Sequence, residues 1–419
     1  MDTGDQIHGE HGTGGNVPGA PSRVALYSHD TQGLGHVRRN IELASALVAA
    51  NPDTDVLLLT GNPEATALPL PPNTDIATLP TVRKDADGGY DSRRMNASLE
   101  SVLRMRTQII TAALDAYDPQ LLIVDKVALG LGAELEPALR MLRARGNNRC
   151  VLGLREILDA PDIAVREWQA ARTSQSIDRY YDEVWVYGDR GVYDPVVEYH
   201  LPDAVAGKIV YTGYLGNGRG LGTTTLIRDR PSLAPPAQPY SLCLVGGGQD
   251  GLELAETFVR AQLPAGQVGV VLTGPFMRRS ARQRLRQLVD DKPDKTLVEF
   301  VPDPGDFIDR AASVVSMAGY NSVCELLTSG ARTLLVPRAK PRTEQLLRAR
   351  RMSELGLVDM VGPADLSSRI LGDWLGTADQ TKPRRYPIDL DGLSRIPRLA
   401  AALLERNQST ATEGGSHAA

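Results

Sequence analysis

Proton-accepting side chains occur where two apolar runs of the N-terminal part end. The residues that follow the run VALY read SHDTQGLGH and contain His29, Asp30 and His36, and Asp125 ends the run LLIVD. An imidazole or a carboxylate can take the proton of an attacking hydroxyl group, so all four are candidate general bases. We rank His36 first. Two alternatives stay open for His36, contact with a phosphate or packing in the turn, and Asp125 can equally be a turn cap.

Glycine-rich segments join apolar runs to helical patterns at two places. Gly33 and Gly35 precede the first helical pattern, where glycine lets the backbone approach a ligand and the helix start offers N–H groups. A plain tight turn is the alternative. Residues 246–251 read GGGQDG and match G-x-G-x-x-G. The next apolar run has no acidic residue at its end to hold a ribose, so we prefer a diphosphate cradle to a dinucleotide site.

A third segment, SMAGYNSVCEL at 316–326, turns from a strand pattern into a helix. Gly319 frees the backbone there, and Asn321 or Ser322 can cap the helix. Glu325 lies one helical turn further on, where a carboxylate can accept hydrogen bonds from both hydroxyls of a ribose. The alternative for Glu325 is a purely structural role in which the helix dipole stabilises the acid.

A fourth segment, LLVPRAKPRTEQ at 334–345, is a proline-bounded basic loop between a strand and a helix. Arg338, Lys340 and Arg342 can neutralise phosphate charge there. For each of them taken singly, a solvated loop position is the more ordinary interpretation.

Strand-like runs alternate with helical patterns twice along the chain. The first series has strands at 24–28, 55–60, 76–79, 121–125, 150–154, 183–187 and 209–212, and helices at 36–50, 95–117, 134–144 and between the strands at 150–154 and 183–187. The second has strands at 241–245, 268–273, 296–301, 313–316 and 333–336, and helices at 252–262, 281–289, 321–328 and 344–355. Such alternation predicts two α/β units, each a doubly wound parallel sheet, which bind ligands where the carboxyl ends of their strands face one another.

The pattern also predicts domain boundaries. We expect a disordered tail at 1–21, a first Rossmann-like domain at 22–215, a Gly- and Pro-rich linker at 216–239, a second Rossmann-like domain at 240–385, a segment at 386–406 whose helix (394–406) packs back on the first domain, and a disordered tail at 407–419. Residues 84–94 are expected to form an exposed loop, and 160–176 to contribute further loops to the first domain.

Composition narrows the class of protein. The 419 residues carry a net charge of −5, which disfavours bulk binding to nucleic acid. The three cysteines lack metal-ligand or disulfide spacing, and no window has the roughly 18 apolar residues of a membrane span. The N-terminus has no signal-peptide pattern. We therefore expect a cytoplasmic protein with no transmembrane segment and no structural metal; the oligomeric state is left open.

The motifs GYNSVCE at 319–325, VP at 336–337 and EQ at 344–345 resemble the donor half of GT-B glycosyltransferases, and in particular the MurG-like group (family 28 C-terminal domain). GLGH at 33–36 is similar to the N-terminal glycine-and-histidine loop of a predicted glycosyltransferase set in that group, and VDK at 124–126 and LREILD at 154–159 look like further segments of it. The resemblance spans residues 24–357.

The resemblance implies a GT-B fold, with two Rossmann-like domains facing across a cleft: an acceptor domain at 22–215 and a nucleotide-sugar domain at 240–385. It also implies a set of site residues. Glu325 would hold the ribose, Gln345 the donor sugar or ribose, and His36 would lie near the reacting centre. The diphosphate would be held by Asn321, Ser322 and the backbone of Gly247 and Gly248. Where the family often has two adjacent glutamines, this chain has Glu344-Gln345, which puts the sugar preference in question.

The implied function is a hexosyltransferase-like enzyme (EC 2.4) that inverts the sugar and needs no cofactor and no metal. Its partners would be a nucleotide-sugar donor and an acceptor, either a small molecule such as a natural-product intermediate or a lipid-linked one. Asp389-Leu390-Asp391 has the spacing of a metal motif but falls in the C-terminal segment, where we read it as chance. The alternatives are a nucleotide-sugar 2-epimerase, a non-catalytic nucleotide-binding protein and, last, an oxidoreductase.

Overall fold

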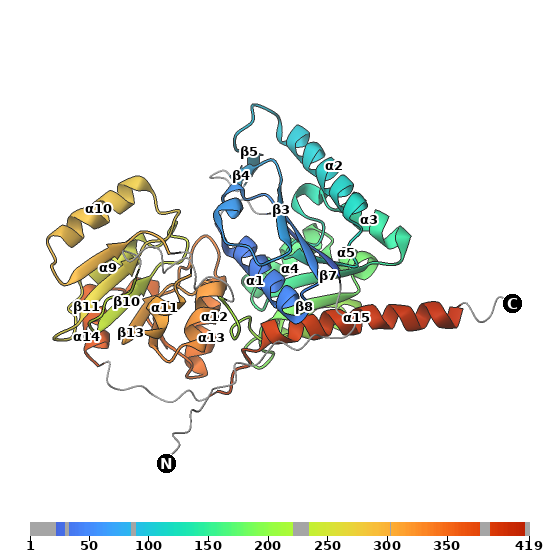
Figure 1. The fold of residues 1–419 in the computed structure, drawn as a ribbon. Helices are drawn as coiled ribbons and strands as arrows, with labels where there is room; N and C mark the ends of the chain where they lie inside the picture. Colours follow the sequence, from blue (N-terminus) through green and yellow to red (C-terminus); the bar gives the residue numbers. More distant parts are fainter. Residues whose placement is uncertain are drawn as a thin grey trace, which may run out of the picture.

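The computed structural model consists of two α/β halves that lie side by side (Figure 1). It describes residues 22–29, 33–84, 89–220, 234–301, 303–377 and 386–414. We refer to residues 22–220 as the N-terminal half and to residues 234–377 as the C-terminal half. The expected N-terminal tail at 1–21 lies outside the described residues, as do 221–233 of the expected linker.

The N-terminal half is built on a seven-stranded parallel sheet with the order β3-β2-β1-β6-β7-β8-β9. Its strands are β1 (Arg23–Ser28), β2 (Asp55–Thr60), β3 (Thr74–Thr78), β6 (Leu121–Asp125), β7 (Arg149–Arg155), β8 (Glu183–Tyr187) and β9 (Ile209–Tyr211). Every residue of the inner strands β6 and β8 is buried, because helices cover both faces of the sheet. This burial explains why these strands read as continuous apolar runs in the sequence.

The helices of this half follow the strands in alternation. They are α1 (Gly35–Ala50), α2 (Leu99–Tyr117), α3 (Glu136–Arg145), α4 (Pro161–Ala170), α5 (Thr173–Tyr180) and the short α6 (Pro195–Glu198) and α7 (Asp203–Ala206), with 3-10 turns at η1 (Pro63–Ala67) and η2 (Leu131–Ala133). Ser98 caps α2 by accepting from the backbone N–H of Ser101, so this helix begins four residues later than predicted.

The C-terminal half contains a six-stranded parallel sheet with the order β12-β11-β10-β13-β14-β15. Its strands are β10 (Tyr240–Leu244), β11 (Val268–Leu272), β12 (Lys295–Val298), β13 (Ser313–Ser316), β14 (Arg332–Leu335) and β15 (Asp359–Met360). Its helices are α9 (Leu252–Arg260), α10 (Arg279–Asp290), α11 (Gly305–Asp309), α12 (Tyr320–Thr328), α13 (Glu344–Glu354) and α14 (Ser368–Gly376), with the 3-10 turn η4 (Pro363–Asp365). The strand order reverses between β10 and β13 here, as it does between β1 and β6 in the other half, and ligands bind at such reversals.

Three segments differ from the sequence prediction. Residues 84–94 are not a plain loop, because β4 (Val82–Lys84) and β5 (Tyr90–Ser92) form an antiparallel pair that packs through Val82 and Tyr90 near Val102 of α2. Residues 160–176 are largely helical, in α4 and α5, which are separated at Arg172, where φ is +50°. The prediction also missed β15 and α14.

The chain returns to the N-terminal half after the C-terminal sheet. Helix α15 (Gly392–Gly414) contacts α1, and Arg406 forms an ion pair with Glu183 of β8 (Figure 1). The predicted end of this helix at residue 406 is wrong, since the helical backbone continues to Gly414; residues 415–419 lie outside the described part.

A buried ion pair joins the two halves. Arg348 of α13 lies with its Nε 2.6 Å from Oε1 of Glu156, which follows β7, and both side chains are fully buried. Arg348 also donates to the carbonyl of Ala318 at 3.0 Å, and Tyr214 donates to Glu156 at 3.2 Å. Nearer the surface, Arg342 pairs with Glu167 at 2.8 Å. The buried pair therefore fixes β7 of one half against α13 of the other.

We predict that Glu156→Gln lowers the free energy of unfolding by about 3–5 kcal/mol, because it leaves the Arg348 charge buried without a counter-charge. Glu167→Gln is the matched control: this side chain is 51% exposed, so its loss should cost less than about 1 kcal/mol. Urea unfolding of the two variants measures both values. Equal losses would show that the buried pair does not hold the halves together.

Candidate active site

A cavity of about 310 Å³ lies between the two halves, at the carboxyl ends of their strands. The N-terminal half contributes the residues after β1 and the first turn of α1, together with Arg155 at the end of β7. The C-terminal half contributes the loops that follow β10, β11, β13 and β14. Both strand-order reversals therefore open into the same cavity.

His36, in the first turn of α1, lines this cavity and is held from behind by Asp125 at the end of β6. The Nδ1 atom of His36 lies 2.7 Å from Oδ2 of Asp125, and Arg39 donates to both oxygens of Asp125 at 2.5 and 2.6 Å. His36 keeps 21% of its side-chain surface exposed, whereas Asp125 and Arg39 keep only 2%. The imidazole is therefore the exposed member of a buried charge network.

Electrostatics fix the hydrogen position on this imidazole. Burial alone would raise the pKa of Asp125, but the neighbouring Arg39 and His36 outweigh it and hold that pKa well below its usual range. Nδ1 of His36 lies 2.7 Å from the carboxylate of Asp125, which can only accept, and 3.0 Å from the guanidinium of Arg39, which can only donate; because the carboxylate is nearer, we assign the hydrogen to Nδ1. Nε2, the nitrogen away from Asp125, is then left with a lone pair that can take a proton.

His29, the fourth candidate base, is poorly suited to that task. Burial, reinforced by the nearby His36 and Lys126, lowers the pKa of His29 to about 3. Its ring centroid lies 5.5 Å from that of His36, and His29 is not among the residues lining the cavity. Asp30 lies outside the described residues.

On the C-terminal side, the glycine loop after β10 forms one wall. Gly248 has φ +89°, and a Cβ atom there would overlap the carbonyl oxygen of Thr273, so only glycine fits. Gly247 also lines the cavity. The loop is therefore held against the end of β11, with part of its backbone facing the cavity.

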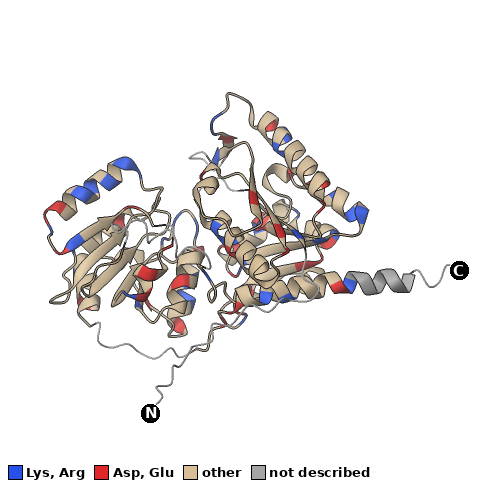
Figure 2. Ribbon diagram, viewed as in Figure 1, with Lys and Arg blue, Asp and Glu red and all other residues tan. Residues whose placement is uncertain are grey.

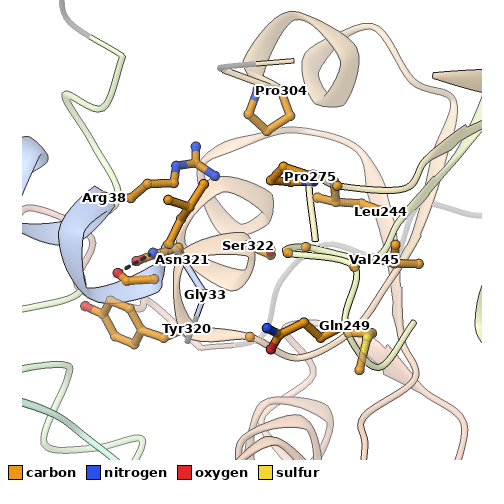
Figure 3. A pocket seen from close by; sticks show the side chains of 18 of the residues that line it. Gly33, Arg38, Leu244, Val245, Gln249, Pro275, Pro304, Tyr320, Asn321 and Ser322 are labelled. Carbon is orange, nitrogen blue, oxygen red and sulfur yellow. Dashed lines mark hydrogen bonds between the residues drawn. The ribbon is translucent and has the colours of Figure 1, made fainter. Parts of the chain in front are cut away.

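The N-terminus of α12 forms a second wall (Figure 3). Its N-cap residue is Gly319, which provides no side-chain cap, and nothing lies within 4 Å of the place where a Cβ atom would sit. Asn321 donates from Nδ2 to the carbonyl of Gly35 at 2.9 Å, and Ser322 lies beside it on the same turn. The helix end therefore presents backbone and open space to the cavity, as an anion site requires.

Charged residues on both sides of the cavity are paired across it or around its rim. Arg38 of α1 lies 3.1 Å from Oε1 of Glu325 in α12. Arg338 pairs with Asp250 of the glycine loop at 2.5 Å and with Glu344 at 2.9 Å. These pairs place cations and carboxylates around the mouth of the cavity.

All ten predicted donor-binding residues line the cavity together with His36. They are Gly33, Gly35, Gly247, Gly248, Gly319, Asn321, Ser322, Glu325, Arg338 and Gln345. Asp125 stands behind His36 and does not line the cavity. Of the other two basic-loop residues, Arg342 is engaged with Asp159 and Glu167, and Lys340 is not among the lining residues.

Sequence reasoning missed three arginines at the site: Arg38, Arg39 and Arg155. Arg39 occupies a buried position of α1 beside the apolar stripe. A charge at such a position needs a buried partner. Arg155 ends a strand whose preceding residues are apolar, so its position at the carboxyl edge of the sheet was a usable signal.

Comparison with known proteins gives matches at the level of structure. No family model and no curated protein matches the sequence. A calicheamicin glycosyltransferase, CalG4, is 15% identical, with a TM-score of 0.55 over 95% of this chain and 99% of its own. MurG of Acinetobacter baumannii is 15% identical, with a TM-score of 0.53 over 92% and 99%. A UDP-N-acetylglucosamine 2-epimerase, described as putative, from Listeria monocytogenes is 12% identical, with a TM-score of 0.54 over 93% and 97%.

The fold is GT-B. Two parallel Rossmann-like sheets facing one cavity are shared with glycosyltransferases over nearly the whole chain, and this confirms the predicted fold class. Within the described residues, no helix is long and apolar enough to cross a membrane, and no group of three metal-ligating side chains occurs.

We predict that Gly248→Ala and Gly319→Ala differ sharply in stability. Alanine at residue 248 must adopt a left-handed conformation and overlap Thr273, which should cost about 1–3 kcal/mol or more. Alanine at residue 319 meets open space, so its stability should stay within about 0.5 kcal/mol of the parent. Thermal unfolding compares them. A large loss for Gly319→Ala would mean that this glycine serves the fold and not a ligand.

Proposed function

We propose that the protein is a glycosyltransferase that moves a hexose from a nucleotide-diphosphate sugar to a small-molecule acceptor, with inversion and without a metal. The observation that carries the proposal is the His36–Asp125 pair, because His36 lines a cavity that is also lined by the N-terminus of α12. A base on one half and an anion site on the other are what a single displacement between two substrates needs.

The C-terminal half would hold the donor. The diphosphate would bind the backbone at Asn321 and Ser322 and the glycine loop at Gly247 and Gly248, where the helix dipole favours negative charge. Glu325 would accept hydrogen bonds from the ribose. In the structure Glu325 pairs with Arg38 through Oε1, so ribose binding would share or replace that contact.

Arg338 and Gln345 would contact the phosphate and the sugar. Arg338 is held at the rim by Asp250 and Glu344, which orients its guanidinium near the glycine loop. Gly33 and Gly35 would bring the backbone at the start of α1 close to the donor from the opposite half.

In the reaction, Nε2 of His36 would take the proton of the acceptor hydroxyl as its oxygen bonds to the anomeric carbon. The bond between that carbon and the diphosphate oxygen breaks, and the electron pair leaves with the diphosphate. Asp125 is a positioning residue that stabilises the protonated imidazole. Attack opposite the leaving group inverts the anomeric centre. The helix N-terminus supplies the charge stabilisation that a metal would otherwise give.

A nucleotide-sugar 2-epimerase is the second candidate, because the Listeria monocytogenes protein described as a UDP-N-acetylglucosamine 2-epimerase shares the fold over nearly the whole chain. An epimerase would release the epimerised sugar nucleotide without any acceptor. A transferase releases the nucleoside diphosphate in step with acceptor consumption, so the products separate the two functions.

We predict that a panel of UDP, dTDP and GDP contains at least one nucleotide that raises the melting temperature. Ligand at 100 times its Kd stabilises a folded protein by about 2.7 kcal/mol. Glu325→Gln should weaken that shift, since it removes the charged acceptor for the ribose hydroxyls. The absence of a shift with every nucleotide would contradict the proposed function.

We also predict that His36→Ala lowers kcat by about 10²–10⁴-fold, the usual contribution of a general base. The nucleotide-induced thermal shift should be unchanged, because His36 would act on the acceptor. The measurement is nucleoside diphosphate release over a panel of small-molecule alcohols. Arg140→Gln, an exposed charge of α3 outside the cavity, is the control and should keep full activity. Undiminished activity in His36→Ala would exclude it as the base.

A further inference from the structure

One cation in the cavity has no partner. Arg155 ends β7 and lines the cavity, and among the described residues its side chain makes no hydrogen bond or ion pair. Its Nε atom is buried without a hydrogen-bond partner. Burial, reinforced by Arg348 and Arg39 and opposed by Glu344 and Glu156, lowers the pKa of Arg155 to about 10. A half-buried guanidinium whose Nε atom is buried without a hydrogen-bond partner is unfavourable for the fold, which indicates a role for the charge.

Lys126 is a second cation at the same sheet edge. It follows β6, the parallel neighbour of β7, and its backbone N–H donates to the carbonyl of Gly153 at 2.8 Å. Within the described chain its ammonium group has no ion-pair partner. Burial first, then Arg155 and Arg342, lower the pKa of Lys126 to about 7, against the opposing effect of Glu344 and Asp125.

The other arginines around this place are compensated by carboxylates. Arg39 pairs with Asp125, and Arg348 with Glu156. By contrast, the basic residues that follow one another along α10 (Figure 2) are compensated by acids, because Arg282, Arg284 and Arg286 pair with Glu256 or Glu299. Arg155, which lines the cavity, and Lys126, which does not line it but follows the neighbouring strand, therefore stand out as positive charges without an ion-pair partner among the described residues.

We propose that Arg155 and Lys126 form a subsite on the N-terminal half that binds an anionic group, a phosphate or a carboxylate, of the acceptor. The inference rests on the proposed function and narrows its acceptor to an anionic compound. Both residues lie at the same sheet edge as Asp125, which holds the base, whereas the diphosphate walls belong to the other half. An anion held there would relieve the repulsion, and hydrogen bonds between charged groups are strong in a desolvated site.

The test uses orthophosphate as the probe and protein saturated with the nucleoside diphosphate found in the thermal-shift panel. Phosphate should raise the melting temperature further, because the donor subsite is already filled. Arg155→Gln and Lys126→Met should each raise the apparent Kd for phosphate by about tenfold or more. Their affinity for the nucleotide should be unchanged. Arg140→Gln, which removes an exposed charge of the same half, should behave as the parent.

Several outcomes would overturn the proposal. Phosphate that competes with the nucleotide would belong to the diphosphate site, and phosphate binding insensitive to both substitutions would be adventitious. A preference for UDP-glucuronate over UDP-glucose that disappears in Arg155→Gln would assign the anion to the donor sugar. If no nucleotide binds, the result would instead contradict the proposed function itself.

Stability distinguishes a lost subsite from a damaged fold. Arg155→Gln removes a desolvated and repelled charge, so the variant should melt no lower than the parent. Reduced phosphate binding in such a stable variant supports the subsite. A variant that melts much lower would show Arg155 to be a structural residue and would contradict the proposal, and Lys126→Met repeats the comparison on the neighbouring strand.

Discussion

The buried ion pair between Arg348 and Glu156 is the contact on which the site depends, because it holds the strand ends of one sheet against a helix of the other. Glu156 is the residue next to Arg155. The segment that pairs with the other half therefore also places a cation at the cavity. Moving two charges out of water costs desolvation free energy, and their mutual attraction offsets that cost only when the hydrogen-bond geometry is good. We expect the pair to contribute more to the relative position of the two halves than to the net free energy of unfolding.

Given that arrangement, each half contributes a different kind of chemistry. The N-terminal half buries Asp125 with Arg39 and leaves the His36 imidazole at the cavity. The C-terminal half contributes a helix start and a glycine loop, which are polar through their backbone and carry little side-chain bulk. Base and anion site therefore meet without being close in sequence, which suits a reaction between two separately bound substrates.

Much of this could be read from the sequence. Apolar runs of strand length predicted the parallel sheets, and glycines at their ends predicted the loops that line the cavity, because strand-to-helix turns at sheet edges have local signals. The pairing of His36 with Asp125 could not be predicted, since it joins residues 89 positions apart. The β4–β5 pair was missed because its polar face hid the buried Val82. Arg155 gave one local signal, a cation at the end of an apolar run, but its lack of an ion-pair partner among the described residues depends on the fold and could not be predicted.

The most direct test of the central claim is a crystal structure with the nucleoside diphosphate bound. The account predicts the diphosphate within hydrogen-bond distance of the backbone N–H groups at the start of α12 and of the glycine loop, and the ribose hydroxyls against Glu325. His36 should not contact the nucleotide, and its hydrogen bond to Asp125 should be unchanged. A nucleotide bound on the N-terminal half, or away from the cavity, would contradict the account.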